Sequence, residues 1–325
     1  MRTSADLKGT KNETSAFEFQ NIELKNGGCP LGTVPIPRIQ LEDIFRTGSL
    51  PKFGKNHDNV IPHHWEADGI LGDDYSATLP NYGTSMLMNL WKPRLRLPRA
   101  QFSLAQTWIS ANGENIEAGW HVYPTLYNDY QTHLFVLWRA DDYAHYCYNL
   151  LCPNGFVQES RNVVPGSVLN PVSTYNGAQH NISRSILKNA LTGDWWLSVG
   201  RDQGNQVKVG YWPRRLFHHL STQATAVKWG GEVYGQSPLP EMGSGHFPQE
   251  GFGKASYFSK IQVKKELGQE NLEDVQPADM TSHYNDVPNC YKSSVGRSEE
   301  QGTYILFGGP AVKHSMVHLS RIESK

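Results

Sequence analysis

Alternating apolar and polar residues dominate the chain from about His63 onward. In the stretch AQFSLAQTWIS (Ala100–Ser110), one face of an extended strand carries Phe102, Leu104, Gln106 and Trp108. Further strand-like segments, separated by Gly, Pro and Asn turns, are Thr84–Trp91, Ile116–Pro124, Thr132–Ala140, Gly193–Gly200, Asn205–Pro213, Thr225–Gly235, Ala255–Val263 and Gly302–Pro310. Short strands with frequent turns predict an all-β protein, an antiparallel two-sheet β-sandwich. Helical periodicity is weak, and Arg214–Ala224 is the best helix candidate.

The first 56 residues differ from the rest of the chain. They are polar and rich in turns, and TVPIPRI (Thr33–Ile39) predicts extended chain, because each proline removes a donor and biases the preceding residue towards β or polyproline geometry. Such a segment cannot build a core of its own, so it is either a disordered arm or a segment docked on another part of the protein. The predicted organisation is residues 1–56, partly extended, followed by a β-sandwich domain at residues 57–325.

Composition narrows the range of partners. The net charge is −1, with no basic stripe, so we expect no nucleic acid and no anionic membrane as partner. The sequence has no apolar run of about 18 residues, and its N-terminus lacks the apolar region of a signal peptide. The adjacent pairs His63–His64 and His218–His219 do not form chelates, because neighbouring side chains diverge in a strand. We therefore expect no metal and no cofactor.

Cysteines and glycosylation sequons give a second set of expectations. Cys147 and Cys152 lie close together in CYNLLC, and a local disulfide is favoured over two free thiols, since no second cysteine pair completes a zinc site. Asn12 (NET) and Asn181 (NIS) are glycosylation candidates.

Two glutamates have matching surroundings about a hundred residues apart. Glu117 lies in IEAGW and Glu232 in WGGEV, each beside a tryptophan and near a glycine that shares its face of the predicted strand. A glycine next to a carboxylate clears space for a bound chain to lie on the sheet. The structural alternative is a sheet whose glutamate-bearing side simply faces solvent.

Two carboxylates brought close together can perform acid–base chemistry. Both cannot ionise cheaply, so one keeps a proton while the other takes a proton from water. The protonated member stabilises the tetrahedral intermediate of peptide hydrolysis through its hydrogen bond to the carbonyl oxygen. The same pair at another separation hydrolyses a glycosidic bond. A Ser-His-Glu triad around Met242–Phe258 is disfavoured, because no G-x-S-x-G elbow is present.

Several stretches together resemble the neprosin family of plant glutamic peptidases. They include CPLGTVPIPR, FSLAQTWIS, IEAGWHVYPTLYNDYQTHLFVLWRADDY, CYNLLCPNGFVQ, GDWWLSVG, VKWGGEVYG, MGSGHFPQEGFGKASYFSKIQV and GTYILFGGP, in order from about Gly28 to Pro310. The resemblance implies a propeptide followed by a catalytic antiparallel β-sandwich. It also implies that Glu117 and Glu232 are the catalytic pair and that Cys147 and Cys152 form the family disulfide.

The same resemblance implies cleavage after proline by a secreted protein that works in acid, outside the cell, in the cell wall or in the vacuole. Residues 1–56 correspond to a propeptide shortened at its N-terminus, which covers the cleft until it is removed. The family's secretory leader has no counterpart here, and neither does the terminal cysteine that follows the Gly-Gly-Pro motif in relatives. Cys290 is thus left either free or paired with Cys29.

The function predicted from the sequence is a glutamic endopeptidase, acid-active and proline-directed, present as an inactive zymogen while its propeptide is attached. Its partners are then proline-rich peptide or protein substrates and its own propeptide. Substrate-binding candidates are Gln106, which orients water or binds the oxyanion, and Trp120 and Trp229, which are cleft or core residues. The competing hypothesis is a non-catalytic or cell-wall carbohydrate-directed β-sandwich binding module, which the tryptophan-rich faces favour.

Overall fold

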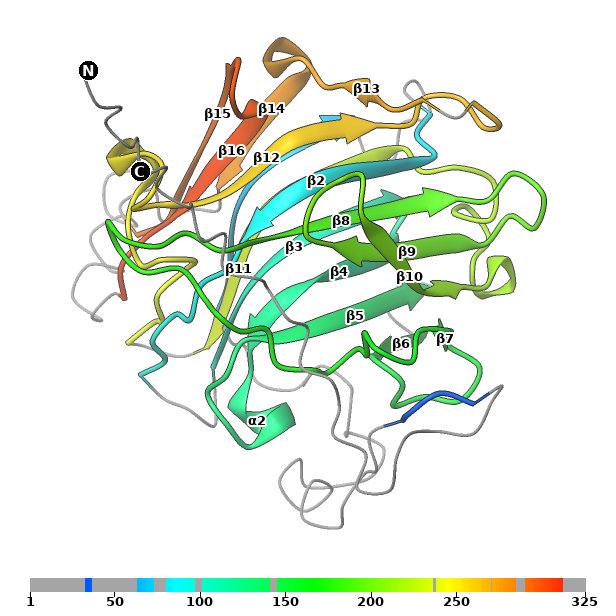
Figure 1. Ribbon diagram of the computed structural model, residues 1–325, viewed down its shortest axis with the longest axis horizontal. Coiled ribbons are helices and arrows are strands. Elements are labelled where there is room, and N and C mark those ends of the chain that lie inside the picture. The colour runs from blue at the N-terminus through cyan, green and yellow to red at the C-terminus, as the bar shows by residue number, and fades with distance from the viewer. Residues whose placement is uncertain are drawn as a thin grey trace, which may run out of the picture.

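The computed structural model describes residues 33–36, 63–72, 80–96, 101–140, 145–235, 238–269, 271–284 and 290–311. The predicted segment 1–56 lies outside the described residues except for Thr33–Ile36, and so do Asn12 and Cys29. The predicted fold class is confirmed: the described chain forms two antiparallel sheets with very little helix (Figure 1).

The first sheet carries the candidate site. Within the described residues it has seven strands, in the order β14 (Met280–Tyr284), β1 (His63–Gly72), β11 (Ala226–Gly235), β3 (Phe102–Ala111), β4 (Glu114–Val122), β5 (His133–Ala140) and β6 (His145–Tyr148). Strand β3 is central, and β4 follows it through a tight turn at Asn112 and Gly113, both with positive φ. Strand β11 comes from much later in the chain and pairs with the other edge of β3.

The second sheet has nine strands in the described part of the chain. Its order is β15 (Lys292–Ser298), β16 (Gly302–Gly308), β12 (Ser256–Val263), β2 (Gly83–Asn89), β8 (Asn181–Lys188), β9 (Trp195–Gly200), β10 (Gln206–Trp212) and β7 (Val157–Gln158), with β13 (Glu273–Asp274) paired to β12. Neighbouring strands pair antiparallel throughout.

The main hydrophobic core lies between the two sheets. From the first sheet it includes Ala105, Ile109, Ile116, Ala118 and Val136, which alternate with the residues on the opposite face of their strands. From the second sheet it includes Met86, Met88, Ile182, Ile186 and Leu197. Because the inner residues of β3, β4 and β11 pack here, their alternate residues, including both candidate glutamates, must occupy the outer face of the first sheet.

The predicted helix over Arg214–Ala224 is wrong. Only the 3-10 turn η2 (Arg214–Leu216) forms there, and the following residues wrap around Glu114 at the start of β4. The buried Glu114 carboxylate accepts the backbone N–H groups of His218, His219 and Leu220 at 2.7, 2.9 and 2.8 Å. These three N–H groups donate to the carboxylate and are therefore not available for the i to i−4 backbone hydrogen bonds that a helix needs.

The remaining helical elements are short. They are α2 (Pro124–Tyr127), η3 (Pro248–Glu250) and η4 (Pro277–Asp279). No helix in the described residues is long and apolar enough to cross a membrane.

The predicted disulfide between Cys147 and Cys152 is confirmed, with the Cα atoms 6.0 Å apart at the end of β6. Cys290 is buried and its thiol is free. Asn181 begins β8, and its side-chain oxygen accepts a hydrogen bond from Asn89 Nδ2 at 3.2 Å. Its glycosylation stays a prediction.

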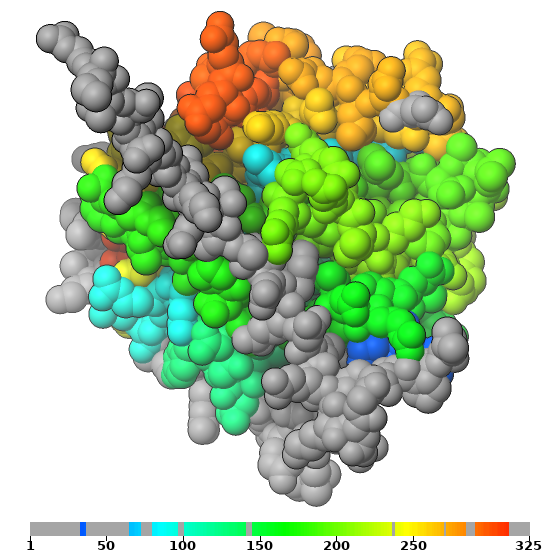
Figure 2. All heavy atoms as spheres, in the orientation of Figure 1, coloured from blue at the N-terminus to red at the C-terminus, as the bar shows by residue number. Residues whose placement is uncertain are grey.

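One short piece of the N-terminal segment is placed against the sandwich. Pro35 is buried, and its carbonyl oxygen accepts a hydrogen bond from Gln158 Nε2 in β7 at 3.1 Å. Figure 2 shows Thr33–Ile36 in blue against the green surface around β7.

Candidate active site

Strand register brings the two glutamates to one face, on either side of β3. Glu232 in β11 lies opposite Leu104, and Glu117 in β4 lies opposite Trp108. Leu104 and Trp108 are four residues apart on β3 and therefore share a face. Directly opposed residues of antiparallel strands also share a face, so Glu117 and Glu232 do as well. Alternation within each strand predicted the face of each glutamate separately, and the strand register shows that the two faces are the same side of the sheet.

Gln106 lies between the two carboxylates. It is fully buried on β3, and its Nε2 group donates to Glu232 Oε2 at 3.4 Å. A side-chain hydrogen bond from Gln106 also acts on Glu117, where it lowers the pKa of that carboxyl group. The amide therefore lies between the two acids, donates a hydrogen bond to Glu232 and influences the pKa of Glu117.

Glu117 is held in an environment that favours its protonated form. Burial raises its pKa, the adjacent guanidinium of Arg139 lowers it, and the negative charge of Glu232 raises it again; the net direction is upward. Arg139 Nη2 lies 2.9 Å from Glu117 Oε1. When the carboxyl group loses its proton, the guanidinium is already in place to stabilise the anion.

Two glycines flank Gln106 and allow the strands to approach at this point. Gly230 in β11 and Gly119 in β4 lie opposite Gln106 on its two sides. A Cβ on Gly119 would lie 1.9 Å from the carbonyl oxygen of Ala105, and one on Gly230 would lie 2.3 Å from that of Ala67. No side chain fits at either position, so only glycine allows the strands to approach this closely.

A third carboxylate, Glu66 of β1, adjoins the pair. It lies directly opposite Glu232, with Lys228 Nζ 3.8 Å from its Oε2 atom. Burial, together with the charge of Glu232, raises the pKa of Glu66 to about 7, even though Lys228 lowers it. Glu66 is therefore protonated in acid, which limits the negative charge around Glu232 there.

A cluster of apolar and aromatic side chains shares the outer face with the two glutamates. This outer cluster consists of Phe102, Leu104, Trp108, Tyr123, Leu126, Phe135, Leu137 and Tyr148. His121 of β4 is stacked on Phe135, with the ring centroids 4.2 Å apart. Burial lowers the pKa of His121 well below its usual value, and the nearby His133 lowers it further, so its ring is neutral in this setting.

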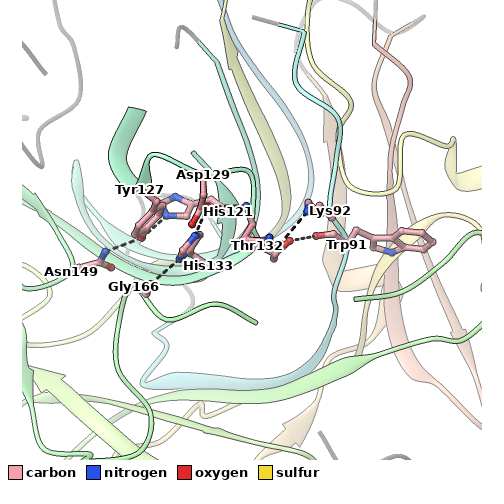
Figure 3. A network of polar contacts seen from close by, with 10 residues as sticks. Trp91, Lys92, His121, Tyr127, Asp129, Thr132, His133, Asn149 and Gly166 are labelled. Carbon is pink, nitrogen blue, oxygen red and sulfur yellow. Dashed lines mark hydrogen bonds and ion pairs between the residues drawn. The ribbon is translucent and has the colours of Figure 1, made fainter. Parts of the chain in front are cut away.

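Figure 3 shows a network of polar contacts that includes His121, Tyr127 and His133. Asn149 Nδ2 donates to the Tyr127 hydroxyl at 2.9 Å, and that hydroxyl lies 2.8 Å from His121 Nε2. His133 stacks on Tyr127 and contacts Asp129 Oδ1 through Nε2 and the Gly166 carbonyl oxygen through Nδ1, both at 2.8 Å. These contacts hold α2 against β4 and β5 and so support the strand that carries Glu117.

Not every sequence-based site candidate lies on this face. Trp120 and Trp229 are fully buried in the core between the sheets, on the side opposite to the glutamates. Their assignment as substrate-binding residues is therefore corrected: adjacency in sequence puts them on the other face of the strand. Gln106, by contrast, lies on the same face as both glutamates, and its role towards water or the oxyanion stays a prediction.

Sequence reasoning missed Arg139 and Glu66. Arg139 is a lone cation in the apolar strand THLFVLWRA, and it pairs in register with Asn115, two residues before Glu117. The antiparallel pairing of β4 with β5 places Arg139 beside Glu117. Glu66 had no such local signal, because its partner strand β11 comes more than 150 residues later.

The arrangement can therefore move protons between water, a bound carbonyl group and an amide nitrogen. One buried acid has a raised pKa and a cation beside it, and a second acid accepts a hydrogen bond from the amide between them. These side chains supply both the proton donor and the proton acceptor that such chemistry needs.

Comparison with known proteins gives distant structural likenesses and a family. The scytalido-glutamic peptidase solved with a transition state analog inhibitor is similar over 77% of this chain and 98% of that chain, at 13% identity and a TM-score of 0.40. SCP-B, a member of the Eqolisin family of peptidases solved with the tripeptide Ala-Ile-His, is similar over 77% and 98%, at 12% identity and a TM-score of 0.37. Residues 99–310 match the Neprosin family, which supports a glutamic-type peptidase. Since that match covers well over half of the sequence and includes both Glu117 and Glu232, the chain belongs to the Neprosin family.

Proposed function

We propose that this protein is an acid-active endopeptidase in which Glu117 and Glu232 form the catalytic pair. The observation that carries the proposal is the position of Gln106, which lies on the strand between the two acids, donates a hydrogen bond to Glu232 and lowers the pKa of Glu117. Two carboxylates on one face of a sheet are common on protein surfaces. Two buried carboxylates on either side of one amide, beside a pair of glycines that bring the strands close together, form an arrangement suited to a reaction.

The roles of the two acids follow from their surroundings. Glu117, with its raised pKa, carries the proton and donates it in a hydrogen bond to the oxygen of the scissile carbonyl group. Glu232, which accepts a hydrogen bond from Gln106, removes a proton from a water molecule as the water oxygen bonds to the carbonyl carbon. The proton on Glu232 then passes to the amide nitrogen, the C–N bond breaks, and a carboxylic acid and an amine are released.

Arg139 assists this reaction by stabilising the ionised form of Glu117. As the carbonyl oxygen gains negative charge, it draws the proton of Glu117, and the carboxylate that forms is 2.9 Å from the guanidinium. Glu117 regains its proton when the tetrahedral intermediate collapses. Arg139 is a positioning residue in this scheme, because it contacts Glu117 and not the substrate.

The proposal includes a preference for proline-containing peptides, which comes from the family resemblance. Next to the Glu232–Leu104 pair along the strands, Tyr234 and Phe102 lie opposite one another with their rings stacked at 5.1 Å. Phe102 is buried, so the half-buried Tyr234 is the ring of this pair that offers a surface to a pyrrolidine ring. The resemblance also supports a secreted protein whose segment 1–56 covers the site as a removable propeptide.

Peptide cleavage mapping tests this function. The full chain, before and after limited proteolysis that removes residues 1–56, is incubated with a mixed peptide library at about pH 3–5, and products are identified by mass spectrometry. We expect cuts concentrated at proline, with more product after the segment is removed. Intact peptides under all these conditions, together with retention of the protein on cell-wall polysaccharide, would instead support a binding module.

A further inference from the structure

We propose that Glu66, Asp68 and His283 form a binding site for one divalent transition-metal cation of the Zn²⁺ class. The three residues lie on the outer face of the first sheet, at its β14 edge. They are distinct from the catalytic pair proposed above, and the inference does not depend on the peptidase activity.

Strand pairing brings the three side chains together. Glu66 and Asp68 are two residues apart on β1 and share a face, and His283 of β14 lies directly opposite Asp68. One potential ligand atom from each side chain lies within 4.8 Å of the others. The sequence did not predict this cluster, because His283 is far from Glu66 and Asp68 along the chain and meets them only through the pairing of β14 with β1.

Asp68 provides an independent reason to expect a cation. Its side chain is fully buried, and within the described part of the chain neither carboxylate oxygen has a partner at hydrogen-bond distance. His283 Nδ1 is 3.6 Å from Asp68 Oδ2, and Asp68 raises the pKa of this imidazole. A buried carboxylate is normally paired, hydrogen-bonded or bound to a metal, since its desolvation is otherwise uncompensated. Of these, a metal satisfies both oxygens and uses the neighbouring ligands.

The donor set matches this class of cation. One imidazole nitrogen and two carboxylates are ligands that Zn²⁺ accepts, with bonds of about 2.0–2.2 Å and a fourth position for water. In a tetrahedral site such bonds hold ligand atoms roughly 3.4 Å apart, so the side chains must close by on the order of 1 Å. Glu66 and His283 have side chains that are 24% and 43% exposed, which leaves them room to do so.

Lys228 is the group that opposes the cation. Its ammonium is 3.8 Å from Glu66 Oε2 and supplies a positive charge beside the site. Bound metal would displace this ammonium towards solvent, to which the side chain is 27% exposed. Removing the lysine is therefore expected to strengthen metal binding, while removing a ligand weakens it.

Metal binding would also hold the edge strand β14 against β1. In the described part of the chain, β14 pairs with β1 alone, so it is an edge strand. A cation held by Glu66 and Asp68 on one strand and His283 on the other links the two strands. Because the cation binds the folded state, it is expected to raise the melting temperature.

The test is isothermal titration of the full chain with Zn²⁺ at pH 7.5, paired with thermal unfolding in Zn²⁺ and in EDTA. We expect wild type to bind one Zn²⁺ and to gain about 3–6 °C in Tm over the EDTA sample. Asp68→Asn and His283→Gln are expected to weaken binding at least tenfold and to lose the Tm gain. Lys228→Met is expected to tighten binding severalfold.

Asp68→Asn separates a ligand role from a structural one. Without metal, the variant replaces a buried carboxylate, whose oxygens have no partner at hydrogen-bond distance in the described residues, with a neutral amide, so its Tm in EDTA is expected to equal or exceed that of wild type. The proposal is overturned if wild type binds Zn²⁺ only weakly and without fixed stoichiometry, or if Asp68→Asn and His283→Gln bind it as wild type does. It is equally overturned if Asp68→Asn melts well below wild type in EDTA, because Asp68 would then be structural.

Discussion

Replacing Glu232 with Gln is expected to lower kcat/KM for peptide cleavage by about 10³-fold, within the range of 10²–10⁴ that general acid–base groups contribute. The amide introduced by Glu232→Gln could not take a proton from water, yet it has nearly the shape of the carboxylate and fills the same place on β11. Glu117→Gln is expected to have a loss of similar size, because an amide cannot transfer a proton to the carbonyl oxygen. The measurement is kcat/KM at pH 4 on one defined peptide, with Tm recorded for each variant.

A matched control comes from an exposed glutamate away from the site. Glu273 in β13 is 52% exposed and contacts Lys265 at 3.2 Å. Glu273→Gln makes the same chemical change and is expected to keep kcat/KM within about twofold, because surface ion pairs contribute little. If Glu117→Gln and Glu232→Gln are folded and cut as fast as Glu273→Gln, the catalytic assignment is wrong.

Gly119→Ala is expected to lower both stability and activity. The new Cβ would lie 1.9 Å from the carbonyl oxygen of Ala105 and 2.7 Å from the Cα of Gln106, and both are backbone atoms in the central strand. Backbone in the middle of a sheet cannot move aside cheaply, so β3 and β4 must separate next to Gln106. We expect the free energy of unfolding to fall by roughly 3 kcal/mol, measured by urea denaturation.

Gly204→Ala is the control for this substitution. Gly204 lies in a turn between β9 and β10, where a Cβ would meet only the side-chain oxygen of Asp202, at 3.3 Å. The same added methyl group is expected to change the free energy of unfolding by less than about 1 kcal/mol there. Equal stability of the two variants would show that the close strand approach at Gly119 does not hold the site together.

The sequence alone predicted correctly those features that depend on residues close together in the chain. Alternation correctly placed Glu117 with Gly119 and His121, and Glu232 with Gly230, because the period of a strand is two. The CYNLLC spacing correctly predicted the disulfide, since five residues suffice to bring Cys147 and Cys152 together. The turn-rich pattern was enough to indicate two antiparallel sheets.

What the sequence could not show depends on which strands are neighbours. Gln106 contacts Glu232 only because β11 pairs with β3 in one particular register, and a shift by one residue would turn Glu232 into the core. Asp68 meets His283 for the same reason, across more than 200 residues of chain. The helix expected at Arg214–Ala224 failed differently: a buried carboxylate, Glu114, bonded the backbone there in a non-helical form.

The most direct test of a coupled pair is the titration of Glu117 by ¹³C NMR of its side-chain carboxyl carbon, assigned by difference from Glu117→Gln. In wild type the pKa is expected to lie above the usual value, because burial raises it and the charge of Glu232 raises it further. In Glu232→Gln that charge is gone, so the pKa of Glu117 is expected to fall. A Glu117 titration curve that is the same in wild type and in Glu232→Gln would contradict the coupling of the two acids across β3.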